Sequence, residues 1–305
     1  MSREKHLEVG IAGRTIEVSR PDKILFPGDG ITKADLVHYY VRVADLMLPH
    51  VRERPVAMKR YPEGIGGHVF FQKQVPEHFP EWIPRVKVQT EEKGMQEHAV
   101  IGEGAVLAYL ADQACIEPHT WLSRADRLDH PDQMIFDLDP STEDVGPIRD
   151  CARALREVLE RVHLGAFLKT SGSKGFHVVV PLDRSADFDS VRTFARGVAR
   201  VVAARAPDRF TLEQRKGKRR GRVYIDVMRN GYLQTAIPPY AVRALPGAPV
   251  AVPLDWDELG RAQPQTYTVA NLFRRLAQRD DPWRGMGGAA HSIRDAKRLL
   301  AGVTD

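Results

Sequence analysis

The sequence predicts an α+β fold in which mixed, largely antiparallel sheets are flanked by helices. Short alternating strands and amphipathic helices follow one another without a strict βαβ rhythm, and adjacent strands are joined by tight turns. The chain has 305 residues, of which 43% are apolar, enough for one large core or two smaller ones. We expect a single domain over residues 1–305, either undivided or made of two packed lobes that divide near residue 130.

The first half of the chain begins with a weakly alternating strand at 14–18 and a loop at 21–30, where Pro and Gly break regular structure. Thr32 is a good N-cap, Asp35 follows three residues later, and apolar residues then recur at helical spacing until Pro49. Further elements are expected as strands at 55–61 and 69–72, a buried helix at 105–115 and an extended segment at 116–119.

The second half opens with a short apolar strand at 133–139, which Pro140 ends. An amphipathic helix follows, because Ile148, Leu155 and Val162 belong to one apolar face. Two strands, 167–171 and 176–182, are joined by a tight Gly-containing turn. The remaining expected elements are a helix at 191–204, a strand at 222–228 and helices at 268–277 and 292–301.

Composition excludes several classes of protein. The chain contains no run of about 18 apolar residues, so no membrane partner is expected, and its first ten residues lack the apolar stretch of a secretory signal. Cys115 and Cys151 belong to no CxxC or Cys/His pattern, which argues against a zinc site. A soluble protein in the reducing cytoplasm fits these features.

The net charge is +5, and the basic residues are unevenly distributed. Residues 214–222, QRKGKRRGR, hold six basic residues in nine positions. Such a run is either a solvated loop or a contact for a polyanion, and the run alone leaves both interpretations open.

Asp137 and Asp139, in the segment MIFDLDP, are the strongest candidates for metal ligands. On a strand, residues i and i+2 project from the same face, so the two carboxylates repel each other unless a cation lies between them. Asp226, in the apolar segment VYIDVM, supplies a third carboxylate. Hard oxygen ligands suit Mg²⁺ or Mn²⁺, and three carboxylates on neighbouring strands can hold two ions for phosphoryl transfer.

The turn between the strands at 167–171 and 176–182 is a candidate phosphate site. Its sequence, KTSGSKGFH, offers backbone N–H groups freed by glycine, the hydroxyls of Ser171 and Ser173, and the charge of Lys174. His177 adds another donor. Taken separately, the turn is equally an ordinary hairpin and His177 an ordinary core histidine. A glycosidase also uses paired carboxylates, but it has no need of this phosphate chemistry.

Together, these motifs match the requirements of nucleotide transfer. Asp137-Leu138-Asp139, then 171–177, then Asp226 resemble the three motifs of the archaeo-eukaryotic primase superfamily. The ordered series SRPDKILFP, ITK, MKRY, VFFQKQ, IEPH, FDLDP, TSGSKGFH, YIDV and TAIPPYAVR is similar to the polymerase domain of bacterial ligase D, an end-joining ligase that works with Ku. The resemblance covers about residues 14–260.

The resemblance implies a gap-filling and end-extending polymerase that prefers ribonucleotides, acts in bacterial non-homologous end joining and is associated with the nucleoid. Asp137, Asp139 and Asp226 would ligate two Mn²⁺ or Mg²⁺ ions, and His177 would assist catalysis. The residues that it implies around the NTP or dNTP are Ser171, Ser173, Lys174, His177, His119, Arg243, Lys59, Phe70 and Phe71. The residues that it implies on the DNA are Lys23, Lys33, Arg219, Arg220 and Arg222.

Lys23 and Lys33 would grip the 5′-phosphate of gapped or broken double-stranded DNA. Lys33 stands in the first turn of an expected helix, where free N–H groups attract phosphate. Without the resemblance, both lysines read as solvated surface residues, and Phe70 and Phe71 read as ordinary core aromatics.

The chain departs from the full ligase in having no KxDG ligase motif and no recognisable phosphoesterase module, so we expect a stand-alone relative or an excised domain. Residues 90–104 and those after Gln278 match no motif of the family. Two alternatives to the end-joining polymerase remain: a dedicated primase that starts strands de novo, and a nucleic-acid-binding protein whose carboxylates are only structural.

Overall fold

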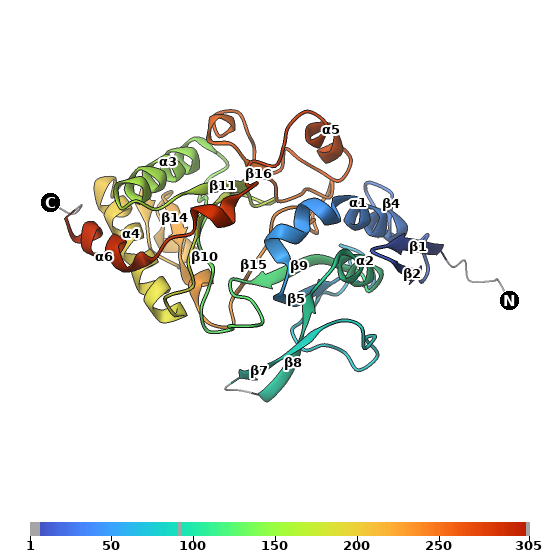
Figure 1. The fold of residues 1–305 in the computed structure, drawn as a ribbon. Helices are drawn as coiled ribbons and strands as arrows, with labels where there is room; N and C mark the ends of the chain where they lie inside the picture. The colour runs from blue at the N-terminus through green and yellow to red at the C-terminus, as the bar shows by residue number, and fades with distance from the viewer. Residues whose placement is uncertain (1–6, 91–92, 303–305) are drawn as a thin grey trace. The chain divides into compact units, whose positions relative to one another are not determined.

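A computed structural model describes residues 7–90 and 93–302 and divides the chain into two compact units (Figure 1). Unit 1 runs to Asp126 and also takes up Thr235–Val250 and Tyr267–Arg274. Unit 2 contains Arg127–Gln234, Ala251–Thr266 and the chain from Arg275 onward. Neither unit is therefore one continuous stretch of sequence.

Unit 1 is built on a sheet of order β15-β9-β5-β8-β7, with β6 paired to β5. Its strands are β5 (Arg54–Arg60), β6 (Phe70–Gln72), β7 (Arg85–Thr90), β8 (Gly94–Ile101), β9 (Cys115–Trp121) and β15 (Thr235–Ala236). Two small hairpins precede the sheet: β1 (Leu7–Ile11) with β2 (Arg14–Val18), and β3 (Ile24–Phe26) with β4 (Ile31–Thr32). All pairings in these sheets are antiparallel, as the sequence predicts.

Helix α1 (Lys33–Val51) begins with the predicted cap, in which the Thr32 hydroxyl accepts from the Asp35 amide and Asp35 accepts from the Thr32 amide. The prediction that Pro49 ends this helix is wrong, because Pro49 lies inside it. The buried side chains of Met47, Leu48 and Val51 pack into the core and hold the last turn helical despite the missing N–H. Helix α2 (Gly104–Asp112) packs beside α1.

The returning segment of unit 1 is anchored to α1 by two buried tyrosines. The Tyr39 hydroxyl donates to the carbonyl of Tyr240 at 2.7 Å, and the Tyr40 hydroxyl accepts from the Val242 amide at 3.2 Å. The Tyr40 hydroxyl also donates to the Ile116 carbonyl in β9 at 2.9 Å. These bonds fix the segment that carries Arg243 onto the helix and the sheet.

Unit 2 contains a second six-stranded sheet, of order β13-β14-β10-β12-β11-β16. Its strands are β10 (Gln133–Asp139), β11 (Phe167–Thr170), β12 (Phe176–Pro181), β13 (Phe210–Thr211), β14 (Val223–Asp226) and β16 (Pro253–Leu254). The central pairings are antiparallel, and only the short β13 runs parallel to β14 among the described strands of this sheet.

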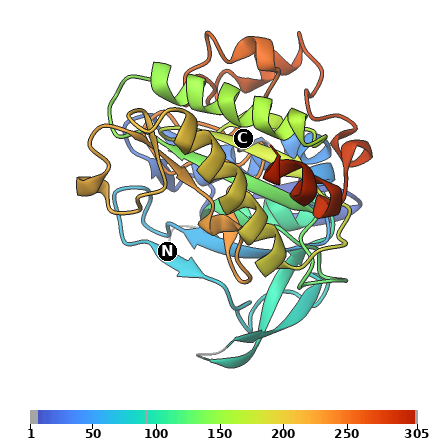
Figure 2. The same cartoon turned by 90° about the vertical axis from the view of Figure 1, so that its left-hand side faces the viewer.

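Helices α3 (Gly146–Arg161) and α4 (Phe188–Arg205) lie against this sheet, and α6 (Ile293–Ala301) packs on α4 (Figure 2). Helix α5 (Leu272–Leu276) is much shorter than the predicted helix at 268–277. Four short 3-10 turns complete the described structure: η1 (Lys216–Lys218), η2 (Met228–Asn230), η3 (Trp256–Glu258) and η4 (Met286–Ala289).

The segment 90–104, which matched no motif, contains β8 and the start of α2, and β8 forms a hairpin with β7. Strand β3 lies within the predicted loop 21–30, where three residues form a short strand. Both cysteines are free and buried. No helix among the described residues is long and apolar enough to cross a membrane.

Candidate active site

The three predicted carboxylates lie on adjacent strands of unit 2. In the sheet register, Asp137 of β10 stands directly opposite Asp226 at the end of β14, and Asp139 stands opposite Tyr224. Leu138, between the two β10 carboxylates, is fully buried on the other face of the strand. The sheet thus brings Asp137, Asp139 and Asp226 together, as the alternation in the sequence predicts.

Asp137 is held by cationic neighbours. Its Oδ1 lies 3.3 Å from Nε2 of His177, and its Oδ2 lies 3.8 Å from Nε of Arg229. Burial alone would raise the pKa of Asp137, but His177 and Arg229 outweigh it and lower the pKa to about 2. Asp137 is therefore ionised at neutral pH.

Asp139 is in the opposite situation. Burial and the neighbouring charge of Asp137 raise the pKa of Asp139 to about 6, with Asp226 adding to the shift and Arg219 opposing it. Nη1 of Arg219 is 3.8 Å from Oδ2 of Asp139. A carboxylate that resists ionisation because of its carboxylate neighbours is relieved by a cation, so these donors fit divalent metal ions.

Asp226 is positioned by its own strand end. Its Oδ1 accepts from the Met228 amide at 2.7 Å and from the Tyr224 hydroxyl at 3.2 Å. Asn230, fully buried, then braces β14 against β10: its side-chain oxygen accepts from the Ile135 amide, and its NH₂ group donates to the carbonyls of Ile135 and Val227. Because β14 ends in this turn, the carboxylate is held in place beside β10.

The Ser171–Gly175 turn packs against the carboxylate strand. A Cβ atom on Gly175 would lie 1.9 Å from the carbonyl oxygen of Leu138, so only glycine fits there. The Ser171 hydroxyl accepts from the amides of Ser173 and Gly175, both at 3.1 Å, and Ser171 is 5% exposed. In this structure Ser171 thus organises the turn, while Lys174 is exposed.

Two residues that the sequence analysis missed support this site. Arg229 reaches Asp137, and Nε2 of Gln265 donates to the Ser173 carbonyl at 3.0 Å, tying the turn to a distant segment of unit 2. Arg229 could have been found from its place directly after the Asp226 strand. Gln265 carries no sequence signal, because only the folded chain brings it to the turn.

The arginines of the basic run at 214–222 differ in their exposure and contacts. Arg219 is 8% exposed and lies over the ring of Tyr224, 4.3 Å from the ring centroid. Arg222 donates to carbonyls of its own loop, including that of Arg219 at 2.8 Å. Arg220 is exposed. Of the three arginines expected on DNA, only Arg220 presents its side chain openly in this structure.

Unit 1 carries a second cluster, centred on Glu117 of β9. Oε2 of Glu117 lies 3.2 Å from Nζ of Lys59 and 3.1 Å from Nε2 of His119, and Oε1 lies 3.4 Å from Nε of Arg243. The Ala244 amide donates to the same Oε1 at 2.9 Å. Glu117 was missed by the sequence analysis, although it stands two residues before His119 and so shares its strand face.

The Glu117 carboxylate fixes three of the residues expected at the nucleotide. Burial would raise its pKa, but the hydrogen bond from His119 and the charge of Arg243 hold that pKa well below its ordinary value. Burial lowers the pKa of His119 even though Glu117 opposes the shift. Lys59, His119 and Arg243 are therefore held around one permanent negative charge.

Phe70 and Phe71 of β6 are 49% and 52% exposed, so the interpretation as core aromatics is wrong. The Phe71 ring lies 6.0 Å from the His119 ring, edge to face, which places it at the margin of the Glu117 cluster. Two exposed aromatic rings beside cationic side chains can stack on bases.

The N-terminal lysines differ from each other. Nζ of Lys23 pairs with Oε1 of Glu63 at 2.8 Å, whereas Lys33 is 3% exposed and its Nζ lies 3.1 Å from Asp112 and 2.8 Å from the Ser19 hydroxyl. For Lys33 the interpretation as a solvated surface lysine is wrong. The backbone N–H of Lys33 donates to the Lys23 carbonyl, which brings the two residues together.

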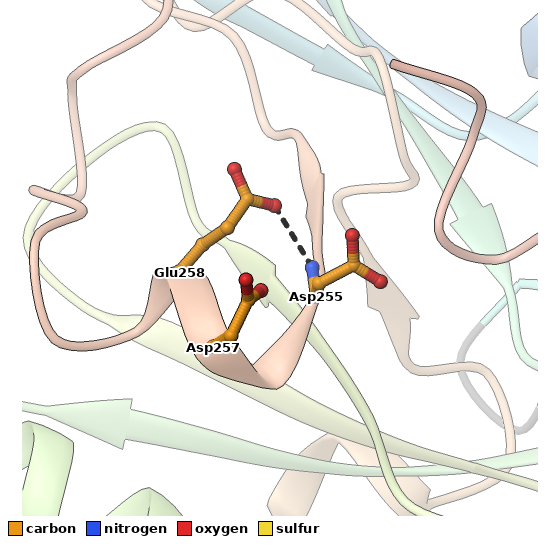
Figure 3. A group of neighbouring side chains, drawn as sticks. All are labelled: Asp255, Asp257 and Glu258. Carbon is orange, nitrogen blue, oxygen red and sulfur yellow. Dashed lines mark hydrogen bonds between the residues drawn. The ribbon is translucent and has the colours of Figure 1, made fainter.

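A second group of three carboxylates occurs in unit 2, formed by Asp255, Asp257 and Glu258 (Figure 3). One oxygen from each lies within 4.8 Å of the others. Glu258 accepts from the Asp255 amide at 3.0 Å and forms a buried ion pair with Arg275. The group caps the 3-10 turn η3, and its most buried member is already paired.

Comparisons with known proteins identify the family of this chain. Residues 32–283 match the family described as the LigD primase-polymerase domain. The chain is 33% identical over 299 residues to the "Multifunctional non-homologous end joining protein LigD" of Pseudomonas aeruginosa, covering 94% of this chain and 34% of the relative. It is 32% identical to the LigD of Mycolicibacterium smegmatis, over 87% of this chain and 35% of the relative.

The chain thus spans about a third of the length of these curated relatives. Among solved structures, the "Polymerase Domain from Mycobacterium tuberculosis Ligase D in complex with DNA" superposes with a TM-score of 0.84 at 30% sequence identity. That match covers 90% of this chain and 99% of the solved one, and it confirms the predicted α+β class. The protein belongs to the LigD primase-polymerase domain family of nucleotidyltransferases.

Proposed function

We propose that the protein is a template-dependent DNA and RNA polymerase that fills gaps and extends DNA ends in bacterial double-strand break repair by non-homologous end joining. The observation that carries this proposal is the cross-strand placement of Asp137 opposite Asp226, with Asp139 two residues on. The names of the relatives, which refer to non-homologous end joining, support the repair context.

Polymerases of this family depend on divalent metal ions, and we assign two Mn²⁺ or Mg²⁺ ions to Asp137, Asp139 and Asp226. The donor set fits, because burial and the like charges of Asp137 and Asp226 raise the pKa of Asp139 to about 6, and a bound cation would relieve that repulsion. Bound ions would activate the attacking hydroxyl and stabilise the leaving pyrophosphate. The chain's own part is to hold Asp226 and Asp137 in fixed positions through Tyr224, the Met228 amide and His177.

The nucleotide triphosphate is assigned to the Ser171–Gly175 turn and to His177. Lys174 is exposed and can reach a phosphate, while Ser171 and Ser173 shape the turn that presents it. For unit 1 taken by itself, we assign Lys59, His119 and Arg243 to nucleotide binding, with Phe70 and Phe71 stacking on bases. A preference for ribonucleotides is part of the proposal and rests on the family.

The DNA is assigned to cationic side chains of unit 1 and, separately, of unit 2. Lys23 and Lys33 are proposed to bind the 5′-phosphate beyond the gap, and Arg220 with its exposed neighbours Arg215, Lys216 and Lys218 to contact the phosphate backbone. Lys33 would act through the pair that it forms with Asp112, whereas Lys23 can exchange its exposed partner Glu63 for phosphate. Arg219 and Arg222 would shape this loop. Ku and a DNA ligase are the proposed protein partners.

One experiment tests the proposal against its alternatives. Labelled gapped DNA is incubated with the protein, single NTPs or dNTPs, and Mn²⁺ or Mg²⁺, in parallel with unprimed single-stranded template. Metal-dependent extension at the gap, stronger with NTPs, is expected. Synthesis on the unprimed template alone would identify a de novo primase, and no incorporation with any metal would leave a non-catalytic DNA-binding protein.

A companion measurement addresses the phosphate contact. Wild-type protein is expected to bind gapped DNA about tenfold more tightly with a 5′-phosphate than with a 5′-hydroxyl, and less so at higher salt. The Lys23→Ala variant removes the more exposed of the two lysines and leaves the buried Lys33–Asp112 contact in place. Equal wild-type affinity for both substrates would refute the phosphate contact.

A further inference from the structure

Lys169 is an unusual residue for the middle of a sheet. It lies in β11, is 1% exposed and is among the largest fully buried side chains of the described chain. Transferring an ammonium group from water into a protein interior is costly, and an apolar side chain of similar volume is often at least as stable. The retention of a charge here indicates that it serves the site rather than the stability of the fold.

The sheet register shows which site that is. Lys169 stands opposite His177 of β12, His177 stands opposite Asp137 of β10, and Asp137 stands opposite Asp226 of β14. Residues directly opposite each other on paired strands project from the same face of a sheet. Lys169, His177, Asp137 and Asp226 therefore form one row across four strands, which we call the charged row.

The charged row has a net charge that depends on Lys169. The two ionised carboxylates contribute a charge of −2 to the row, and the ammonium group of Lys169 offsets one unit of it whether His177 is neutral or protonated. The influence extends to Asp137, two strands away from Lys169, since the charge of Lys169 is among those that lower the pKa of Asp137. Charges act over longer distances in a poorly solvated interior than in water.

We propose that Lys169 is a positioning charge that sets the balance between metal and triphosphate binding at the carboxylates. A fixed positive charge weakens the attraction of the charged row for a divalent cation and strengthens its attraction for the polyanionic triphosphate. Metal ions and pyrophosphate must leave after each addition, and a row without this positive charge would hold the cation more tightly. This inference rests on the proposed polymerase function.

The test is to replace Lys169 by Met, which keeps the volume and removes the charge, and by Arg, which keeps the charge. Mn²⁺ binding without nucleotide is measured by the loss of the free Mn²⁺ electron paramagnetic resonance signal, and KM for NTP is measured on gapped DNA. Lys169→Met is expected to bind Mn²⁺ about three- to tenfold more tightly and to show a KM about three- to tenfold higher. The Lys169→Arg variant is expected to keep both the Mn²⁺ affinity and the KM for NTP close to the wild-type values.

The opposite direction of the two changes is the signature of a charge. If Lys169 only supported the fold, its loss would weaken the binding of both Mn²⁺ and NTP. That result would overturn the inference, as would an unchanged Mn²⁺ affinity together with an unchanged KM. Thermal unfolding of Lys169→Met checks that the variant is folded. Failure of the wild-type protein to incorporate nucleotide would refute the proposed function instead, while the Mn²⁺ titration would still decide whether Lys169 acts on the carboxylates.

Discussion

Unit 2 contains two groups of three carboxylates, and they differ in how their charges are compensated. In the Asp255–Asp257–Glu258 group, the buried Glu258 is paired with Arg275 and accepts the Asp255 amide, and its pKa is lowered despite burial. In the Asp137–Asp139–Asp226 group, the pKa of Asp139 is raised to about 6 by burial and by its carboxylate neighbours. Proximity of carboxylates alone therefore does not identify a metal site, and the raised pKa of Asp139 distinguishes the group to which we assign the metal ions.

The largest expected effect separates the two groups by activity. Asp226→Ala or Asp137→Ala should slow nucleotide incorporation by about a thousandfold or more, since losing a metal ligand removes several kcal/mol of transition-state stabilisation. Single-turnover extension of gapped DNA measures the loss, and circular dichroism confirms folding. Asp257→Ala, in the exposed part of the other group, is the matched control and should extend DNA at the wild-type rate. Wild-type-like extension by either site variant would refute the metal assignment.

The second prediction removes the ion pair that compensates the charge of Glu258 in the Asp255–Asp257–Glu258 group. Arg275→Ala leaves Glu258 buried without its guanidinium partner and should lower the free energy of unfolding by about 3 kcal/mol. Urea denaturation measures the change. Added Mn²⁺ should restore none of the lost stability if the Asp255 group is purely structural. Rescue by Mn²⁺ would show that this group is a metal site after all.

The third prediction concerns Lys174, in the turn that packs against the strand of Asp137 and Asp139. Lys174→Ala should raise KM for nucleotide about tenfold or more while leaving the affinity for gapped DNA nearly unchanged, because a charge-assisted hydrogen bond to phosphate contributes about 1.5–3 kcal/mol. Steady-state kinetics and fluorescence anisotropy supply the two numbers. Should DNA affinity fall at constant KM, the Ser171–Gly175 turn would be a DNA contact.

The smallest effect concerns pH. Because the pKa of Asp139 is raised in the folded protein, its contribution to stability is fully present below about pH 4 and is lost as pH rises through about 6. Metal-free Asp139→Asn should therefore match wild type at pH 4 and be more stable at pH 7.5. The side chain is 46% exposed, so the gain is only about 1 kcal/mol. Differential scanning calorimetry without metal tests this, and a variant less stable than wild type at pH 7.5 would contradict the raised pKa.

Local rules predicted the parts of this protein that depend on neighbouring residues. The i, i+2 alternation places Asp137 and Asp139 on one face, and the Thr32–Asp35 cap is correctly located. The same alternation, applied to β9, would have found Glu117. Gln265 could not be found, because its contact with Ser173 spans 92 residues and leaves no pattern.

The buried side chains were the least predictable from sequence. The sequence suggests that Lys33 and Arg219 are surface cations, but their side chains are 3% and 8% exposed. Lys33 forms an ion pair with Asp112, and Arg219 lies over the ring of Tyr224. The sequence analysis identified neither partner. The β7–β8 hairpin was not predicted, and the strands β3, β13, β15 and β16 are too short for periodicity to identify. The metal ions, the nucleotide contacts and the DNA contacts remain proposals for the experiments above.

The discontinuity of unit 1 has a consequence for the chain as it leaves the ribosome. Strand β15 and the backbone groups of Tyr240 and Val242 lie more than 100 residues after Asp126, so the nascent unit 1 lacks an edge strand and these partners of Tyr39 and Tyr40 until that segment emerges. The first segment of unit 2, Arg127–Gln234, is translated in the interval. A fragment ending at Asp126 should therefore be prone to aggregation, and expression of the protein should tolerate slow translation poorly within this interval.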